Sequence, residues 1–233
     1  MLTRGGDAGE LVGALPDTAS PQLAGRRLAC LCRPAGAAIV LGSSQDLVVA
    51  DAATGAGIDV VRRRSGGGAV YVAPREQVWL DAYLPAGDAL LQRDVARTAW
   101  WLGDLWAGAL ADTLSEPRSD FEVHRGGLAT TAWSRVACFA GLGPGEVTLR
   151  GRKIVGLSQR RDRRGAWLHS MALVSLDATR LAGLLALEDE ERAALARDLE
   201  SATVTLSEVL EARARVGTPT TGTLHGLADR VES

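Results

Sequence analysis

The residue best suited to chemistry in this sequence is its single lysine, Lys153. Lysine and arginine together number 26, yet only this one is lysine, and it lies in the segment GRKIVGLSQ at 151–159. A lysine ammonium is a compact charge on a flexible stem, whereas a guanidinium is a rigid planar fork. A small pocket that grips one carbonyl or phosphate oxygen can require the former. A leftover surface lysine is the alternative reading.

A second candidate site is the run of glycines in VVRRRSGGGAVY at 60–71. Gly66, Gly67 and Gly68 lie between two predicted strands, where the absence of a Cβ lets the backbone approach a ligand and present its N–H groups to an anion. Arg62 and Arg63 beside them supply charge-assisted donors for phosphate or carboxylate. A flexible hairpin with exposed arginines would give the same pattern.

Other ligand signatures are missing from the sequence. No P-loop motif occurs, and the glycines at 141–145 lack the strand-to-helix context of a dinucleotide loop. The three histidines are too dispersed to form a zinc spacing with the cysteines. We expect no structural metal and no tightly bound cofactor.

Size and composition set the class of protein. With 233 residues, 46% of them hydrophobic, the chain can form one large domain with a substantial core. Its formal charge of −2 gives no overall attraction to nucleic acid or to a membrane. Because no stretch is apolar and long enough to span a bilayer and no signal peptide is evident, we expect a cytoplasmic protein with reduced cysteines.

Hydrophobic patterning predicts strands and helices in separate runs. Strands are expected at 37–41, 58–62, 68–72, 77–84, 121–124, 134–140, 146–149, 153–158 and 167–174. A long amphipathic helix at 94–114 should lie across the sheet, and further helices are expected near 179–187, 188–200 and 207–216, with Asp177 and Ser207 as N-caps. This order indicates an α+β or mixed α/β domain.

The domain organisation follows from the same patterns. Residues 1–26 have weak periodicity, so we expect a loosely ordered arm there, or a short helix near Glu10–Leu15. The catalytic domain is predicted at 27–216, followed by a tail at 217–233.

Together the two motifs resemble the lipoate-protein ligase A family. The stretch RRRSGGGAVY at 62–71 is preceded by Gly42-x-x-Gln45 and followed by GRKIVGLSQRR at 151–161, in the order found in that family. The resemblance implies the catalytic fold shared with biotin-protein ligases, a mixed, mostly antiparallel sheet flanked by helices. It also implies activation of lipoate or octanoate by ATP and Mg²⁺ as an acyl-adenylate, and transfer of the acyl group to a lysine of a lipoyl domain.

The resemblance assigns roles to individual residues. Lys153 matches the family's active-site lysine, which holds the acyl carbonyl and phosphate oxygens as charge develops on them. Arg63 would contact phosphate or carboxylate, and the glycine run would cover the acyl chain and the adenylate. The full set of implied substrate and nucleotide contacts is Arg62, Arg63, Ser65, Gly66, Gly67, Gly68, Ala69, Gly156 and Ser158.

Cys138 opens an alternative mechanism. The segment Ala137-Cys138-Phe139, shortly before the lysine motif, resembles the cysteine-dependent octanoyltransferases, in which this cysteine forms a thioester without ATP. A nearby Lys153 ammonium would favour the thiolate. The alternative is that Cys138 is a small buried residue, which is common for free cysteine.

A third possibility is an inactive acyl-binding member of the family. Val72-Ala73-Pro74-Arg75 replaces the His-Asp and Gly-Asn pairs that usually follow the glycine motif, and His169-Ser170-Met171 replaces an expected His-Gly pair.

The partners implied are small carrier domains. They are the lipoyl domain of a 2-oxoacid dehydrogenase acyltransferase or the glycine-cleavage H protein, acyl carrier protein in the transferase reading, and a separate accessory domain in the ligase reading. The basic stretch at 150–164 is expected to meet an acidic carrier.

A nucleic-acid binder using this stretch and Arg62–Arg64 is the rival hypothesis, in which Lys153→Arg would be harmless. We expect neither nucleic acid nor membrane as a partner.

Overall fold

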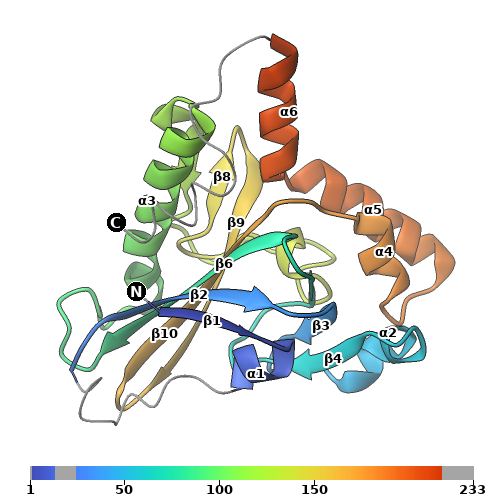
Figure 1. Ribbon diagram of the computed structural model, residues 1–233, viewed down its shortest axis with the longest axis horizontal. Helices are drawn as coiled ribbons and strands as arrows, with labels where there is room; N and C mark the ends of the chain where they lie inside the picture. The colour runs from blue at the N-terminus through green and yellow to red at the C-terminus, as the bar shows by residue number, and fades with distance from the viewer. Residues whose placement is uncertain (1, 14–24, 217–233) are drawn as a thin grey trace.

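Two β-sheets and the helices around them make up the computed structural model, which describes residues 2–13 and 25–216 (Figure 1). The large sheet has the order β1-β2-β6-β10-β9-β8-β7. Its strands are β1 (Leu2–Gly6), β2 (Leu28–Pro34), β6 (Gln77–Pro85), β10 (Gly165–Leu173), β9 (Arg152–Asp162), β8 (Val147–Leu149) and β7 (Phe121–Val123). β1 runs parallel to β2, and the remaining neighbours are antiparallel.

The small sheet has the order β4-β3-β5, with β4 (Asp59–Arg62) parallel and β5 (Val70–Val72) antiparallel to β3 (Ala38–Leu41). The α-helices are α1 (Ala8–Gly13), α2 (Asp51–Gly55), α3 (Val95–Leu114), α4 (Ala178–Gly183), α5 (Asp189–Ala202) and α6 (Leu206–Val216). Single 3-10 turns occur at η1 (Leu47–Ala50), η2 (Arg118–Asp120) and η3 (Cys138–Ala140).

Side-chain alternation along β6 divides the core into two layers. Leu80, Ala82 and Leu84 belong to the core layer that contains Leu102 and Trp106 of α3. Trp79 belongs instead to the layer that contains the small sheet, α1, α4 and part of α5. Because successive side chains of a strand point to opposite faces, the large sheet separates the α3 layer from the space that faces the small sheet.

The predicted fold class is confirmed: the molecule is a mixed α/β structure with a mostly antiparallel sheet flanked by helices. The long helix predicted at 94–114 is α3. It begins after Asp94, whose carboxylate accepts hydrogen bonds from the backbone N–H groups of Ala96 and Arg97. The predicted N-cap Asp177 is also confirmed, since its side chain accepts from Arg180 N at 2.8 Å.

The described part of the N-terminal segment is not a loose arm, and α1 overlaps the short helix expected near Glu10–Leu15, whereas residues 14–24 of the predicted arm lie outside the described residues. Residues 2–6 form β1 at the edge of the large sheet, and α1 buries Leu11 and Val12. The strand β2, which pairs with β1, had no clear alternation and was not predicted. The predicted tail at 217–233 lies outside the described residues.

Two other local predictions were wrong. The segment predicted as a strand at 134–140 is a loop ending in η3, because its backbone groups bond locally and to Ala69 rather than along a ladder. The helix expected to be capped by Ser207 starts one residue earlier. Thr205 takes the capping role, accepting from Glu208 N while its own N–H donates to the Glu208 carboxylate.

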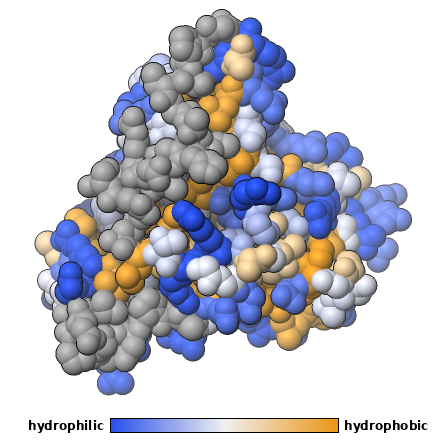
Figure 2. All heavy atoms as spheres, viewed as in Figure 1, coloured by the Kyte–Doolittle hydropathy of each residue, from blue (hydrophilic) through white to orange (hydrophobic). Residues whose placement is uncertain are grey.

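On the face shown in Figure 2, hydrophilic residues cover much of the described surface, and hydrophobic residues are interspersed among them. Among residues 2–13 and 25–216, no helix combines the length and the apolar character that crossing a membrane requires.

Candidate active site

An apolar pocket lies between the two sheets. Its wall includes Val12 of α1, Val40, Val70 and Val72 of the small sheet, and Trp79 and Met171 of the large sheet. All of these come from strands or a helix whose inward faces meet at this place. A pocket of this lining suits an apolar ligand.

In front of this pocket an open cleft is bordered by the glycine loop Gly66–Gly68, the start of α3 and the loop at 141–146. The pocket and the cleft share Cys138, Leu157 and Ser158 in their walls. These three residues therefore mark the mouth of the pocket. The cleft also has two exposed apolar side chains at its border, Val95 and Leu128.

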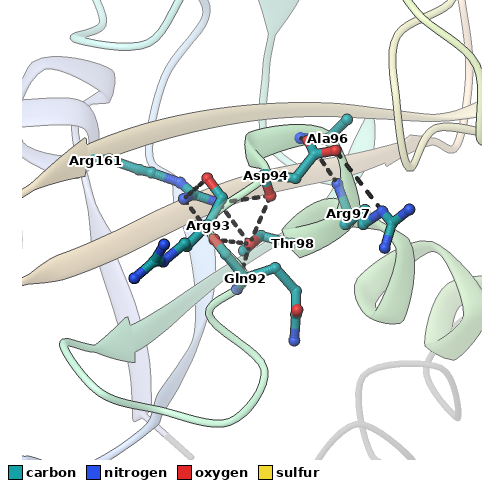
Figure 3. A network of polar contacts seen from close by, with 7 residues as sticks. All are labelled: Gln92, Arg93, Asp94, Ala96, Arg97, Thr98 and Arg161. Carbon is teal, nitrogen blue, oxygen red and sulfur yellow. Dashed lines mark hydrogen bonds and ion pairs between the residues drawn. The ribbon is translucent and has the colours of Figure 1, made fainter.

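The start of α3 is held in the cleft wall by Arg161 of β9 (Figure 3). The guanidinium donates to the carbonyl oxygens of Gln92 at 2.7 Å and Asp94 at 3.2 Å, and to the Thr98 hydroxyl. Partial burial lowers the pKa of Arg161 from its ordinary value. Arg161, the last arginine of the lysine motif, thus fixes the start of α3 in position.

The glycine loop is built around Arg63. Its buried guanidinium donates to the carbonyl oxygens of Gly66 at 2.8 Å, Gly68 at 2.9 Å and Val40 at 3.1 Å. Gly67 has a φ of 102°, and a Cβ on Gly68 would lie 2.6 Å from the backbone of Ala137. The loop therefore requires glycine at these places. Arg63 lines the pocket, but these three hydrogen bonds show that its guanidinium ties the glycine loop to β3.

The remaining residues of the glycine motif occupy different positions. Ser65 Oγ lies 2.9 Å from Ser158 Oγ, which joins the loop to β9 at the pocket mouth. Ala69 pairs with the loop before η3 through Ala69 N to Val136 O and Cys138 N to Ala69 O. Arg62 points away, 3.9 Å from Asp46, and lines neither pocket nor cleft among the described residues.

Gln45 explains the upstream Gly42-x-x-Gln45 motif. Its side-chain oxygen accepts from Gly42 N at 2.9 Å, while its nitrogen donates to the carbonyl oxygens of Arg135 and Val136. The glutamine fastens the end of β3 to the segment that carries Cys138.

Lys153 lies beneath the floor of the cleft. Its buried Nζ is 2.9 Å from Cys138 O, 2.8 Å from Gly141 O and 2.6 Å from Glu146 Oε2. All three ammonium hydrogens have acceptors. A Cβ on Gly156 would lie 3.1 Å from the Phe139 ring and 3.6 Å from Lys153 Cε, so the glycine makes room for both side chains.

Glu146 was not predicted to be part of the site. It lines the cleft, is buried, and accepts from Gly143 N at 2.6 Å and Leu157 N at 2.9 Å besides its ion pair with Lys153. A buried carboxylate with these partners links the 141–146 loop to β9. The signal for Glu146 in the sequence was its position, as an acidic residue directly between Gly145 and the apolar strand β8.

Cys138 and Ser158 are the reactive groups that the structure brings to the pocket mouth. Cys138 is half-buried, and its Sγ would be 3.9 Å from a Cβ on Gly67. Lys153 touches the carbonyl of Cys138, so the predicted lysine, cysteine and glycine loop are contiguous. Among the described residues, no cluster of three or more histidine, cysteine or acidic side chains could hold a metal ion.

Known proteins can now be compared with this site. Residues 29–218 match the family model of the lipoyl protein ligase A/B catalytic domain. Because this match spans most of the chain, the protein belongs to that family. No curated protein sequence gave a significant match.

The solved structures that share the fold include the two that follow. One comes from a study of a bi-partite lipoate protein ligase and its E2 lipoyl domain from Thermoplasma acidophilum, with 15% identity, a TM-score of 0.56, and coverage of 99% of this chain and 92% of that chain. The other is P. falciparum LipL1 in complex with lipoate, with 17% identity, a TM-score of 0.55, and coverage of 87% of this chain and 47% of that one. At these identities the likeness establishes the fold alone.

Proposed function

We propose that this protein transfers a lipoyl or octanoyl group to a lysine of a lipoyl carrier domain. One observation carries the proposal. The apolar pocket opens at Cys138 and Ser158 into a cleft that is open to solvent. Burial of each methylene of a medium acyl chain contributes about 0.8 kcal/mol to binding. The pocket would hold the chain, and the acceptor lysine would enter through the cleft.

One route uses Cys138 as nucleophile. Its thiolate attacks the carbonyl carbon of an acyl carrier thioester, the carrier thiol leaves, and an acyl-enzyme thioester remains. The neutral amine of the acceptor lysine then attacks this thioester, forming the amide and regenerating the Cys138 thiol. The position of Cys138 at the mouth, where the carbonyl of a chain bound in the pocket would lie, favours this route.

The second route is the acyl-adenylate mechanism that family membership suggests. ATP with Mg²⁺ would activate the free acid, and Lys153 would stabilise charge on the carbonyl and phosphate oxygens. Lys153 would then exchange at least one of its present acceptors, Cys138 O, Gly141 O or Glu146, for the substrate. An inactive acyl-binding protein would use the pocket without either reaction.

The partners follow from this function. The acceptor would be the lipoyl domain of a 2-oxoacid dehydrogenase acyltransferase or the glycine-cleavage H protein, in the cytoplasm. Acyl carrier protein would be the donor in the Cys138 route. The adenylate route would use a separate accessory domain, by analogy with the similar bi-partite archaeal ligase.

The decisive experiment supplies apo lipoyl domain with either lipoate and MgATP or octanoyl carrier protein. Wild type and Cys138→Ala are compared by the mass of the acceptor. Octanoylation without ATP that disappears in Cys138→Ala supports the thioester route. ATP-dependent lipoylation that survives the substitution supports the adenylate route, and no modification under either condition contradicts the proposed enzyme.

A further inference from the structure

A buried acid and histidine pair lies in the wall of the apolar pocket, apart from Lys153. His169 Nδ1 is 3.0 Å from Asp81 Oδ1, and Trp79 Nε1 donates to the same oxygen at 2.7 Å. Asp81 is only 1% exposed. Within the described residues its Oδ2 has no hydrogen-bond partner. A buried carboxylate is costly unless it is paired and hydrogen-bonded, and here one of its two oxygens has both of its contacts.

Strand register places this pair next to the pocket mouth. His169 of β10 pairs with Asp81 of β6 on one side and with Ser158 of β9 on the other. His169 and Ser158 line the pocket, whereas Asp81 lies behind them. Because a carboxylate only accepts, Nδ1 carries the hydrogen that points to Asp81. The neutral imidazole then has a lone pair on Nε2, the ring nitrogen left for the pocket.

The other charged groups around Cys138 include Lys153, Arg63 and Glu146, which already make hydrogen bonds or ion pairs within the protein. The hydrogens of Lys153 go to Cys138 O, Gly141 O and Glu146 Oε2. Arg63 donates to backbone carbonyl oxygens and does not accept a proton. Glu146 and Asp94 line the cleft in front, Glu146 being paired with Lys153. Of the described residues that line the pocket with Cys138, His169 is the one built to accept a proton.

We propose that His169, held by Asp81, is the general base for the Cys138 thiol, an inference that rests on the thioester route above. The proton of Sγ passes to Nε2 directly or through one water, and the thiolate attacks the acyl carbon. His169 returns the proton to the departing carrier thiolate. In the second half it takes a proton from the attacking amine and gives it to the Cys138 thiolate. Asp81 is a positioning residue that fixes the ring and its hydrogen.

The test measures the alkylation rate of each cysteine by iodoacetamide between pH 5 and 9, using peptide mass spectrometry. No acyl substrate is needed. Cys30 and Cys32 are 0% and 2% exposed, so their peptides serve as internal references. The variants are His169→Gln and Asp81→Asn, with circular dichroism as a folding check. The matched control is His124→Gln, at the end of β7, where the ring contacts Gly127 O and lines neither pocket nor cleft.

We expect His169→Gln to slow Cys138 alkylation at pH 7 about tenfold and to move the rise of the rate to higher pH, because an ordinary thiol is only a few per cent ionised there. Asp81→Asn should have the same effect to a smaller extent, and His124→Gln none. Identical pH profiles for wild type and His169→Gln would overturn the inference. Failure of the thioester route is a separate result, namely acyl transfer that survives Cys138→Ala.

Discussion

At the scale of single residues, Lys153 and Glu146 are the most consequential pair. The motif around the lysine predicted a role in the site, which stays a prediction; the structure shows that its Nζ donates to the carbonyl oxygen of Cys138. Its partner was not predictable, because the 2.6 Å contact depends on how the 141–146 loop folds over β9. The same holds for Asp81 and His169, which strand register alone brings together.

Breaking this buried ion pair should be costly from either side. Lys153→Met and Glu146→Gln each leave one polar partner uncompensated, so we expect each to lower the free energy of unfolding by about 3–5 kcal/mol. The double variant should be less destabilised than the sum, with a coupling of about 1–3 kcal/mol. Urea unfolding of the wild type, the two single variants and the double variant measures this double-mutant cycle.

The matched cycle uses Arg62→Met and Asp46→Asn, a pair 3.9 Å apart and largely exposed. Its coupling should stay below about 1 kcal/mol. Equal coupling in the two cycles would contradict the structural importance assigned to Lys153 and Glu146.

At the scale of elements, the alternation and the helical periodicity of apolar residues predicted the helices and strands that bury one regular face. α3 and most strands were found at their expected positions, because each buries one regular face. β1 and β2 were missed since they lack a clear alternation, and residues 134–140 were misassigned because apolar residues there enter the core from a loop. The apolar pocket between the sheets depends on how these elements pack, which periodicity does not reveal.

The contact between β9 and the start of α3 should matter for stability. Arg161→Gln removes charge-assisted bonds to Gln92 O, Asp94 O and Thr98, so we expect a loss of about 1–3 kcal/mol in the free energy of unfolding. Arg160→Gln is the control, since the neighbouring side chain of a strand points to the opposite face. Thermal unfolding of both variants distinguishes them; a similar melting temperature for the two would contradict the role of Arg161.

At the scale of the whole molecule, the turn between β9 and β10 carries exposed Arg163 and Arg164 at one end of the sheet. If an acidic carrier domain docks here, Arg163→Glu with Arg164→Glu should slow association about tenfold at low salt, and the difference should shrink as salt increases. Stopped-flow binding of the lipoyl domain measures the rate. The control reverses Arg192 and Arg197 of α5, on the other side of Figure 1; an equal slowing there would indicate a general charge effect.

The N-terminal helix contributes to the pocket at the same scale. Val12 lines the pocket but is not among the residues shared with the cleft, so it lies away from the mouth. We expect Val12→Phe to favour shorter acyl chains and Val12→Ala longer ones, by roughly 10-fold per methylene. Relative kcat/KM for hexanoyl, octanoyl and decanoyl donors checks this, and Leu105→Ala on the exposed side of α3 is the control. An unchanged ranking in both Val12 variants would contradict the assignment.

β1 and α1 precede residue 29, where the match to the family model begins. Val12 of α1 therefore brings to the pocket a side chain from outside the matched region, whereas the other residues of the pocket lining lie within that region. The apolar lining can therefore change at this one position while both sequence motifs of the matched region stay the same.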